Sequence, residues 1–296
     1  MQLRQNAYFW ALLAVTLWST VATAFKLALD HLQPTALVVY ATTLSALALV
    51  ATCAFQGKLS ACRIELKKRP LFYLFTGIIN PVGYYLVLFS AYDLLPGSQA
   101  QPINYTWAIS LTILSVVFLG RTLRKVDVVA CFLGYTGVLI VATQGNITDC
   151  QFDSAWGVLL ALISTFLWSA YWIINARSEV DSTVSLTNSF VVATLLLWLV
   201  LGHTLDSSAL SVTSFGAVLY IGLFEMGITF LFWSKAMRLA TNTAIIANLI
   251  FLSPFVSLWL LHVIRGEVIY PSTILGLSII VCALLIQRFP RARSSK

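Results

Sequence analysis

The sequence predicts an all-α membrane protein with ten transmembrane helices arranged as two inverted five-helix repeats. Three observations carry this prediction: the composition, the number of long apolar segments and a duplicated pattern. Of the 296 residues, 59% are hydrophobic and 10% are charged, and the mean hydropathy is +0.88. A chain of this composition cannot cover its apolar side chains with its own polar surface in water. It is therefore expected to be integral to a membrane.

Long apolar segments fill most of the chain. A helix needs about 20 mostly apolar residues to cross roughly 30 Å of hydrocarbon. Ten segments meet this requirement, and no soluble domain is expected beside them. The predicted spans are 7–29, 35–55, 71–92, 99–119, 126–143, 156–176, 184–203, 214–234, 242–264 and 270–289.

A duplicated pattern relates the two halves of the chain. The string Leu17-Trp18-Ser19 in the first apolar segment comes back as Leu167-Trp168-Ser169 in the sixth. Gly77 corresponds to Gly222 at an offset of 145 residues. An odd number of helices in each copy forces the second copy to enter the membrane upside down relative to the first. Duplication with inversion is typical of carriers that alternate access around a central site.

The loops agree with this inversion. Gly120-Arg121 opens a basic loop, whereas the corresponding Gly266-Glu267 opens a nearly neutral one. We expect a first repeat over 1–145, a second, inverted repeat over 154–290, and a basic cytoplasmic tail over 291–296.

The distribution of positive charge predicts the orientation. If both termini are cytoplasmic, all Lys and Arg residues except Lys26 and Arg265, 16 of the 18, belong to inside segments. This bias matches the positive-inside rule. We therefore expect a multi-pass protein of the cell membrane, inner or plasma, with both termini in the cytoplasm. The net charge of +7 is spread over short loops, so a nucleic-acid partner is not expected.

The fourth apolar segment carries the strongest candidate site. Gln101, Asn104 and Tyr105 share one helical stripe, and Trp107 stands beside them. The two carboxamides on this stripe need hydrogen-bond partners. They fit bonds between helices, or a cavity lining that offers donors, acceptors and flat apolar area to a small amphipathic solute.

Aromatic and polar residues on three other segments are candidates for the same cavity. The hydroxyls of the first segment either bond to carbonyls one turn back or line the cavity. The rings either anchor the protein at the membrane interfaces, or stack on an aromatic substrate or hold a cation. These candidates are Trp18, Ser19, Asn80, Tyr84, Trp168, Tyr171 and Trp172.

Two ionisable residues lie inside predicted spans. Glu225 stands near the middle of the eighth segment and corresponds to Asn80 in the first half. A carboxylate at that depth is protonated, paired or in a wet cavity. Glu225 is therefore either a neutral acid bonded between helices or a site for a proton or a cationic substrate. Lys26 lies near the end of the first segment and is expected to extend to the lipid headgroups, the alternative being a gate or the partner of a carboxylate.

Several strings resemble the drug/metabolite transporter superfamily in its EamA-type, ten-helix branch. They are Leu17-Trp18-Ser19-Thr20, Asn104-Tyr105-Thr106-Trp107, Leu167-Trp168-Ser169-Ala170-Tyr171, and Ser253-Pro254 followed by Gly266-Glu267. The resemblance covers nearly the whole chain, and within the branch the strings look most like YddG-type exporters of aromatic amino acids. The family usually has proline after the fourth-segment Trp, whereas here Ala108 follows Trp107. A kink of the family is therefore expected to be missing.

Taken with the resemblance, the residues predict a transporter of a small amphipathic metabolite. The expected substrate is an aromatic or neutral amino acid. The transporter is expected to export it by alternating access. A proton is a possible coupling ion, and the lipid bilayer is the other expected partner. The alternative is an efflux carrier for cationic or aromatic compounds. A membrane-embedded lipid-modifying enzyme is disfavoured, because no HExxH, GxSxG or paired aspartates occur in or beside a span. No cofactor or metal is expected.

Overall fold

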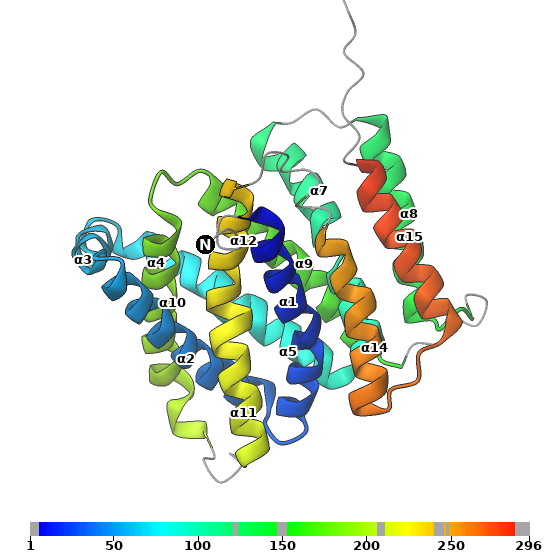
Figure 1. Ribbon diagram of the computed structural model, residues 1–296, viewed down its shortest axis with the longest axis horizontal. Helices are drawn as coiled ribbons and strands as arrows, with labels where there is room; N and C mark the ends of the chain where they lie inside the picture. Colours follow the sequence, from blue (N-terminus) through cyan, green and yellow to red (C-terminus); the bar gives the residue numbers. More distant parts are fainter. Residues whose placement is uncertain are drawn as a thin grey trace, which may run out of the picture.

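The computed structural model describes residues 6–120, 124–146, 153–205, 211–239, 246 and 249–287, and within these the chain is all-helical (Figure 1). Eight stretches are long and apolar enough to cross a membrane, and two shorter apolar helices follow them, Leu249–Arg265 and Pro271–Ile286. The eight are Ala7–Leu29, Pro34–Phe55, Pro70–Leu94, Gly97–Leu119, Lys125–Ala142, Ala155–Asn175, Ser182–Thr204 and Ser214–Trp233.

The fold class, an all-helical membrane protein, agrees with the expectation from sequence, whereas ten crossings stay a prediction. Parts of the predicted segments 242–264 and 270–289, and the whole predicted tail 291–296, lie outside the described residues.

Helix ends follow local signals. Side chains of Asn6, Ser154 and Asp181 accept hydrogen bonds from the first N–H groups of the helices that they precede. Gly120 and Gly266 end the fourth and ninth segments in the left-handed region, with φ of 62° and 66°. The uninterrupted helices are α1 (Ala7–Leu29), α2 (Pro34–Phe55), α3 (Leu59–Lys68), α8 (Lys125–Ala142), α9 (Ala155–Ala176), α10 (Ser182–Leu201) and α15 (Pro271–Gln287).

Three of the long segments are interrupted, and the ninth segment begins with a turn of 3-10 helix. Pro81 lies inside the first interruption, where it cannot donate a helical hydrogen bond. The third segment runs through α4 (Pro70–Gly77), the kinked stretch η2 (Ile78–Gly83) and α5 (Tyr84–Leu94). The fourth runs through α6 (Gly97–Asn104) and α7 (Trp107–Leu119). The eighth runs through α11 (Val212–Tyr220), η5 (Ile221–Ile228) and α12 (Thr229–Leu239), and the ninth through η6 (Leu249–Leu252) and α14 (Ser253–Arg265).

A two-residue turn interrupts the fourth segment. Ala108 replaces the usual proline, yet α6 ends at Asn104 and α7 begins only at Trp107. The N–H of Thr106 donates to Ile103 O at 3.1 Å, a tighter pattern than that of an α-helix. The interruption therefore comes from this turn, not from a proline at position 108.

The outside of the bundle is apolar and its interior holds small polar side chains. Phe55, Leu199 and Leu71 are 94%, 80% and 77% exposed. The hydroxyls of Ser110 and Thr165, in contrast, are buried and lie 2.7 Å apart. Apolar outer surfaces and small polar residues between helices are typical of packing in lipid.

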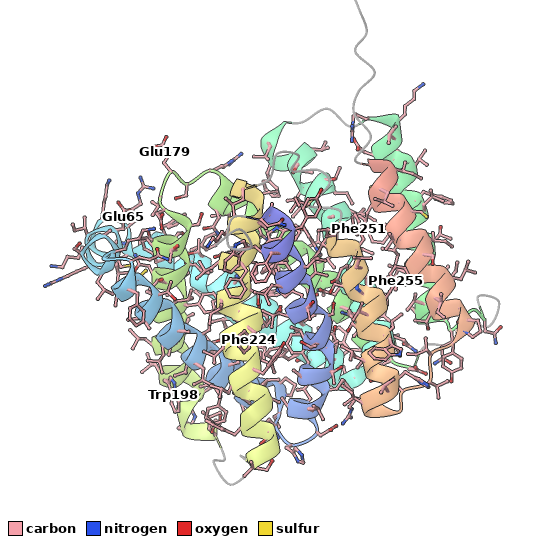
Figure 2. All side chains as sticks on the ribbon, in the orientation of Figure 1. Glu65, Glu179, Trp198, Phe224, Phe251 and Phe255 are labelled. Atoms are coloured by element: carbon pink, nitrogen blue, oxygen red, sulfur yellow. The ribbon has the colours of Figure 1, made fainter. Side chains whose placement is uncertain are left out.

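Labelled side chains mark the two ends of the bundle. Glu65 on α3 and Glu179 before α10 lie at one end, and Trp198 of α10 lies near the other (Figure 2). At the first end Lys58 forms an ion pair with Asp181 at 2.9 Å. The segments between α2 and α4 and between α9 and α10 therefore meet on the same side.

Corresponding helices of the two halves pack in reciprocal pairs. α8 lies beside α15 at one edge of the bundle, and α2 lies beside α10 at the other (Figure 1). A Cβ atom added to Gly77 would lie 2.8 Å from Ser189 O on α10, and one added to Gly222 would lie 2.8 Å from Ala41 O on α2. Both glycines therefore allow the same close backbone approach.

This approach predicts that Gly222→Ala lowers the free energy of unfolding by about 1 to 3 kcal/mol, because the new methyl group meets backbone and Leu44 Cβ, 2.7 Å away. The measurement is the thermal unfolding midpoint of the purified protein in detergent. Gly216→Ala is the matched control, since nothing lies within 4 Å of its Cβ. An equal midpoint for both variants would contradict the prediction.

Candidate functional site

A cavity of about 250 Å³ lies among the interrupted helices. Its walls come from both halves of the chain, and they are mostly aromatic with a few polar groups. This composition suits a small ligand that is apolar on one side and polar on another. The lining residues are Trp18, Val21, Ala22, Phe25, Tyr84, Leu88, Tyr92, Gln101, Asn104, Tyr105, Trp107, Trp168, Trp172, Glu225, Phe230, Trp233 and Ile250.

Phe230 connects aromatic rings from both halves of the chain. Its ring centroid lies 5.5 Å from that of Trp18, 5.7 Å from Trp168 and 6.4 Å from Trp172. Trp168 also packs against Tyr84 at 4.7 Å. Offset and tilted ring pairs of this kind are favourable beyond the area that they bury. The cluster thus joins α1, α5, α9 and α12 around the cavity.

Glu225 brings a carboxyl group to the wall. It lies in η5, and the hydroxyl of Tyr85 donates a long hydrogen bond of 3.4 Å to its Oε1. The side chain is partly accessible rather than sealed between helices. A carboxyl group placed this way can exchange a proton with the cavity or pair with a positively charged ligand.

The structure brings most of the predicted site residues together. Three of them lie apart from the lining. Ser19 donates to Val15 O one turn back, at 2.7 Å; Asn80 is buried in η2 with φ of −147°; and Tyr171 packs against Trp168. Those that line the cavity are Trp18, Tyr84, Gln101, Asn104, Tyr105, Trp107, Trp168, Trp172 and Glu225.

The remaining lining residues were not predicted from sequence. On α1 and α5 they continue the helical face of a predicted residue: Phe25 follows Trp18 by seven positions, and Tyr92 follows Tyr84 by eight. Extending that face by one or two turns would have found them. The unpredicted residues are Val21, Ala22, Phe25, Leu88, Tyr92, Phe230, Trp233 and Ile250.

Charged side chains connect helix ends where α1 and α14 finish; we call this the Asp30 end. The Arg265 guanidinium forms a two-point ion pair with Asp30, in which Nη2 donates to Oδ1 at 2.8 Å. Glu267 accepts hydrogen bonds from the N–H groups of Gly97 and Ser98, at 3.1 and 2.9 Å, at the start of α6. A carboxylate is favourable at the positive end of a helix.

Lys26 completes the connections at the Asp30 end. Its Nζ donates to Tyr92 O at 2.8 Å and Leu95 O at 3.2 Å, where α5 ends. The expectation that Lys26 extends to the lipid headgroups is wrong. The helical donor to Tyr92 O would be the N–H of residue 96, and Pro96 has none, so this carbonyl is free to accept from the lysine.

No group of three His, Cys, Asp or Glu side chains suited to a metal ion occurs in the part of the chain that the structure describes.

Known proteins resemble the chain over most of its length. The aromatic amino acid exporter YddG of Ancylobacter novellus is 26% identical over 287 residues, 96% of this chain and 95% of that protein. An uncharacterised transporter of Archaeoglobus fulgidus is 23% identical over 94% of this chain and 97% of its own length. The transporter YyaM of Bacillus subtilis, also uncharacterised, is 23% identical over 63% of this chain, and the match spans 64% of that protein.

A crystal structure of a protein with 22% sequence identity has the same fold, with a TM-score of 0.68 over 95% of this chain and 96% of the other. The EamA-like transporter family matches twice, over residues 5–143 and 155–288. With a cavity inside a bundle of apolar helices and a family match along nearly its whole length, the chain belongs to the EamA-like transporter family, whose members transport solutes and are not enzymes.

Proposed function

We propose that the protein exports a small amphipathic metabolite, an amino acid with an aromatic or neutral side chain, by alternating access. The observation that carries the proposal is the cavity, which combines ring faces with the amide groups of Gln101 and Asn104 and the carboxyl group of Glu225. Rings bind an apolar side chain, and the polar groups bind an amino acid head. The name of the relative from Ancylobacter novellus, an aromatic amino acid exporter, supports the same substrate class.

The proposed architecture has ten helices in two inverted repeats, 1–145 and 154–290, followed by the tail 291–296. Two observations support it. The interruptions fall in corresponding third and eighth segments, directly after Gly77 and within the turn that contains Gly222. The close contacts are reciprocal as well, because Gly77 meets α10 while Gly222 meets α2.

Both termini are proposed to be cytoplasmic, with the protein in the cell membrane. The end of the bundle that carries Lys58 and α3 is then inside, and the Asp30 end is outside. The basic residues of α3 and its flanks, Lys58, Arg63, Lys67, Lys68 and Arg69, fit an inside position.

Alternating access requires that the cavity be closed from one side at a time. The Asp30 end supplies a closure, because its hydrogen bonds join α1, α14 and the turn between α5 and α6. Tyr92, whose carbonyl accepts from Lys26, also lines the cavity. Opening to the outside would therefore have to break these bonds, and we propose that the structure corresponds to a state closed on that side.

Glu225 is proposed to adjust the charge of the cavity and to exchange a proton during the cycle. A carboxyl group in a cavity that opens to either side takes up or releases a proton according to the solution that it meets. The second candidate function uses the same residue. A permanently charged Glu225 among Trp and Phe rings suits efflux of cationic or aromatic compounds.

Counterflow separates the two functions. Proteoliposomes loaded with unlabelled substrate are expected to accumulate labelled phenylalanine or tryptophan, because the cavity binds both ring and head group. Threonine tests a neutral side chain without a ring, and a quaternary amine tests cation efflux. Exchange of the amine alone would support the second function, and exchange of none of the amino acids would refute export of this class.

The proton role of Glu225 predicts that Glu225→Gln abolishes the stimulation of transport by an imposed pH gradient, because an amide cannot exchange the proton. The measurement is uptake into proteoliposomes with and without the gradient. Trp172→Phe is the control, since it changes the same cavity and keeps the carboxyl group. Unchanged rate and pH dependence in Glu225→Gln would make Glu225 structural.

The outer closure predicts that Asp30→Asn and Arg265→Gln each speed the labelling of Phe25→Cys by a membrane-impermeant maleimide about two- to fivefold, as expected for loss of a partly exposed ion pair. The double variant should label no faster than either single one, because both substitutions remove the same interaction. The parent protein without Phe25→Cys is the control. Additive effects would mean that the two residues act separately.

A further inference from the structure

A short helix, α3, runs along the edge of the bundle instead of through it. Its ten residues connect α2 to α4, and it packs against these two helices and against α10. Figure 1 shows α3 nearly end-on, whereas α2 and α10 beside it are seen from the side. The axis of α3 therefore lies across the direction of α2 and α10.

Specific contacts fix the orientation of α3 on the bundle. The side-chain Nδ2 of Asn188 on α10 donates to Cys62 O at 3.0 Å, and Cys62 Sγ lies 3.4 Å from Cys53 Sγ on α2. Lys58, directly before α3, forms its ion pair with Asp181 at the start of α10. One face of α3 is therefore held against the bundle, and the opposite face is turned outward.

Two apolar side chains mark the depth of α3 in the membrane. Phe55 is the last residue of α2, Leu71 is the second residue of α4, and both are largely exposed. On the outside of a membrane-spanning bundle, large apolar side chains lie in the hydrocarbon. The hydrocarbon therefore extends to the helix ends on both sides of α3. This arrangement places α3 at the level of the lipid headgroups.

The outward face of α3 combines positive charge with one apolar side chain. Ile64 is 63% exposed, and Lys67 and Lys68 follow it at the three- and four-residue spacing of one helical face. Glu65, the acidic residue of α3, is turned further inward: its side chain is 21% exposed, against 62% for that of Lys68. The two charged groups are 3.9 Å apart, so the acid neutralises the outward face only weakly.

Basic residues are concentrated in this part of the sequence. Residues 58–69 hold five of the 18 Lys and Arg, whereas the connection between the seventh and eighth apolar segments, 204–213, holds none. Arg63, Lys67 and Arg69 are exposed and form no ion pair with another described residue. We call the outward set, Arg63, Ile64, Lys67, Lys68 and Arg69, the basic face of α3.

We propose that the basic face of α3 binds anionic phospholipids of the surrounding membrane. Its four cations pair with the phosphate groups, and Ile64 inserts between the first carbons of the acyl chains. Guanidinium and ammonium groups form charge-assisted hydrogen bonds with phosphate, and an amphipathic helix at a membrane surface gains from both the apolar and the electrostatic contact. None of these residues lines the cavity, so the proposal does not depend on which solute is transported.

Lipid binding to the purified full-length protein in detergent tests the proposal. Native mass spectrometry measures the affinities for phosphatidylglycerol and for phosphatidylcholine, and the wild type should prefer phosphatidylglycerol. The variant Arg63→Gln/Lys67→Gln/Lys68→Gln/Arg69→Gln should bind phosphatidylglycerol at least about 10-fold more weakly, because each cation near the anionic headgroups contributes to binding. The matched control removes four positive charges elsewhere and should bind as the wild type does. It is Arg288→Gln/Arg291→Gln/Arg293→Gln/Lys296→Gln.

Three outcomes of this measurement would overturn the proposal. The first is a wild type without preference for phosphatidylglycerol. The second is an equal loss of affinity in both variants, which would make the effect one of net charge. The third is displacement of the lipid by free glycerol 3-phosphate at the same concentration, which would indicate a site for small soluble anions.

A second measurement keeps all four cations and does not depend on the folding of a multiple variant. A bimane fluorophore on Ile64→Cys, in liposomes with phosphatidylglycerol, should be quenched by lipids that carry a nitroxide at the start of an acyl chain. The quenching should be about threefold stronger than for Glu179→Cys, because an apolar residue of an interfacial helix enters the acyl region. Glu179 is the matched control, since it is exposed at the same end of the bundle but lies before α10 (Figure 2). Labelled protein without either substitution gives the background. Equal quenching at the two positions, or quenching of Ile64→Cys by aqueous iodide alone, would place the basic face in water and overturn the proposal.

Discussion

Backbone polar groups must be satisfied inside the hydrocarbon of a membrane, and this constraint decides where the chain can depart from a helix. Irregular backbone is tolerated where it is buried in protein or borders a cavity. The interruptions of this bundle obey that restriction. Tyr84 directly follows the turn in the third segment, Trp107 follows the turn in the fourth, Glu225 lies within the turn of the eighth, and all three line the cavity. The cavity and the irregular backbone are therefore one structure.

The ring cluster connects this irregular backbone to the movement that transport requires. Phe230 comes from the second half of the chain and contacts Trp18 from the first half as well as Trp168 from its own. Each ring pair contributes about 0.5 to 1.5 kcal/mol beyond the buried area, so the contacts can rearrange singly during a cycle. A flat apolar ligand replaces some of them with contacts of its own.

The sequence was sufficient to predict the helical membrane class and most of the cavity's polar residues, because composition, apolar length and clustered carboxamides are local properties. The paired Leu-Trp-Ser strings were informative in a limited way: both tryptophans line the cavity, but Ser19, one residue further around the helix, turns back to Val15 O. Phe230 was missed because a phenylalanine in an apolar segment has no distinguishing neighbour in sequence.

The break before Trp107 was missed because it depends on a turn without proline. The contacts of Lys26 were missed because its acceptors lie some 66 residues away in the chain.

The contacts at the Asp30 end affect the rates of transport measured from the two faces of the membrane. Lys26 corresponds, at the 150-residue offset of the Leu-Trp-Ser strings, to Ala176, and the cation beside it, Arg177, donates to Phe118 O near the end of α7, so the two halves use different contacts at the ends of their first helices. A carrier held shut more firmly on one face than on the other is kinetically asymmetric: its half-saturating concentrations and maximal velocities differ between the two faces. Detailed balance still fixes their ratio, so the lysine cannot set the direction of net flux. Under the proposed alternating access, it would influence which solution the empty carrier samples for longer, and hence on which side of the membrane competing solutes meet it.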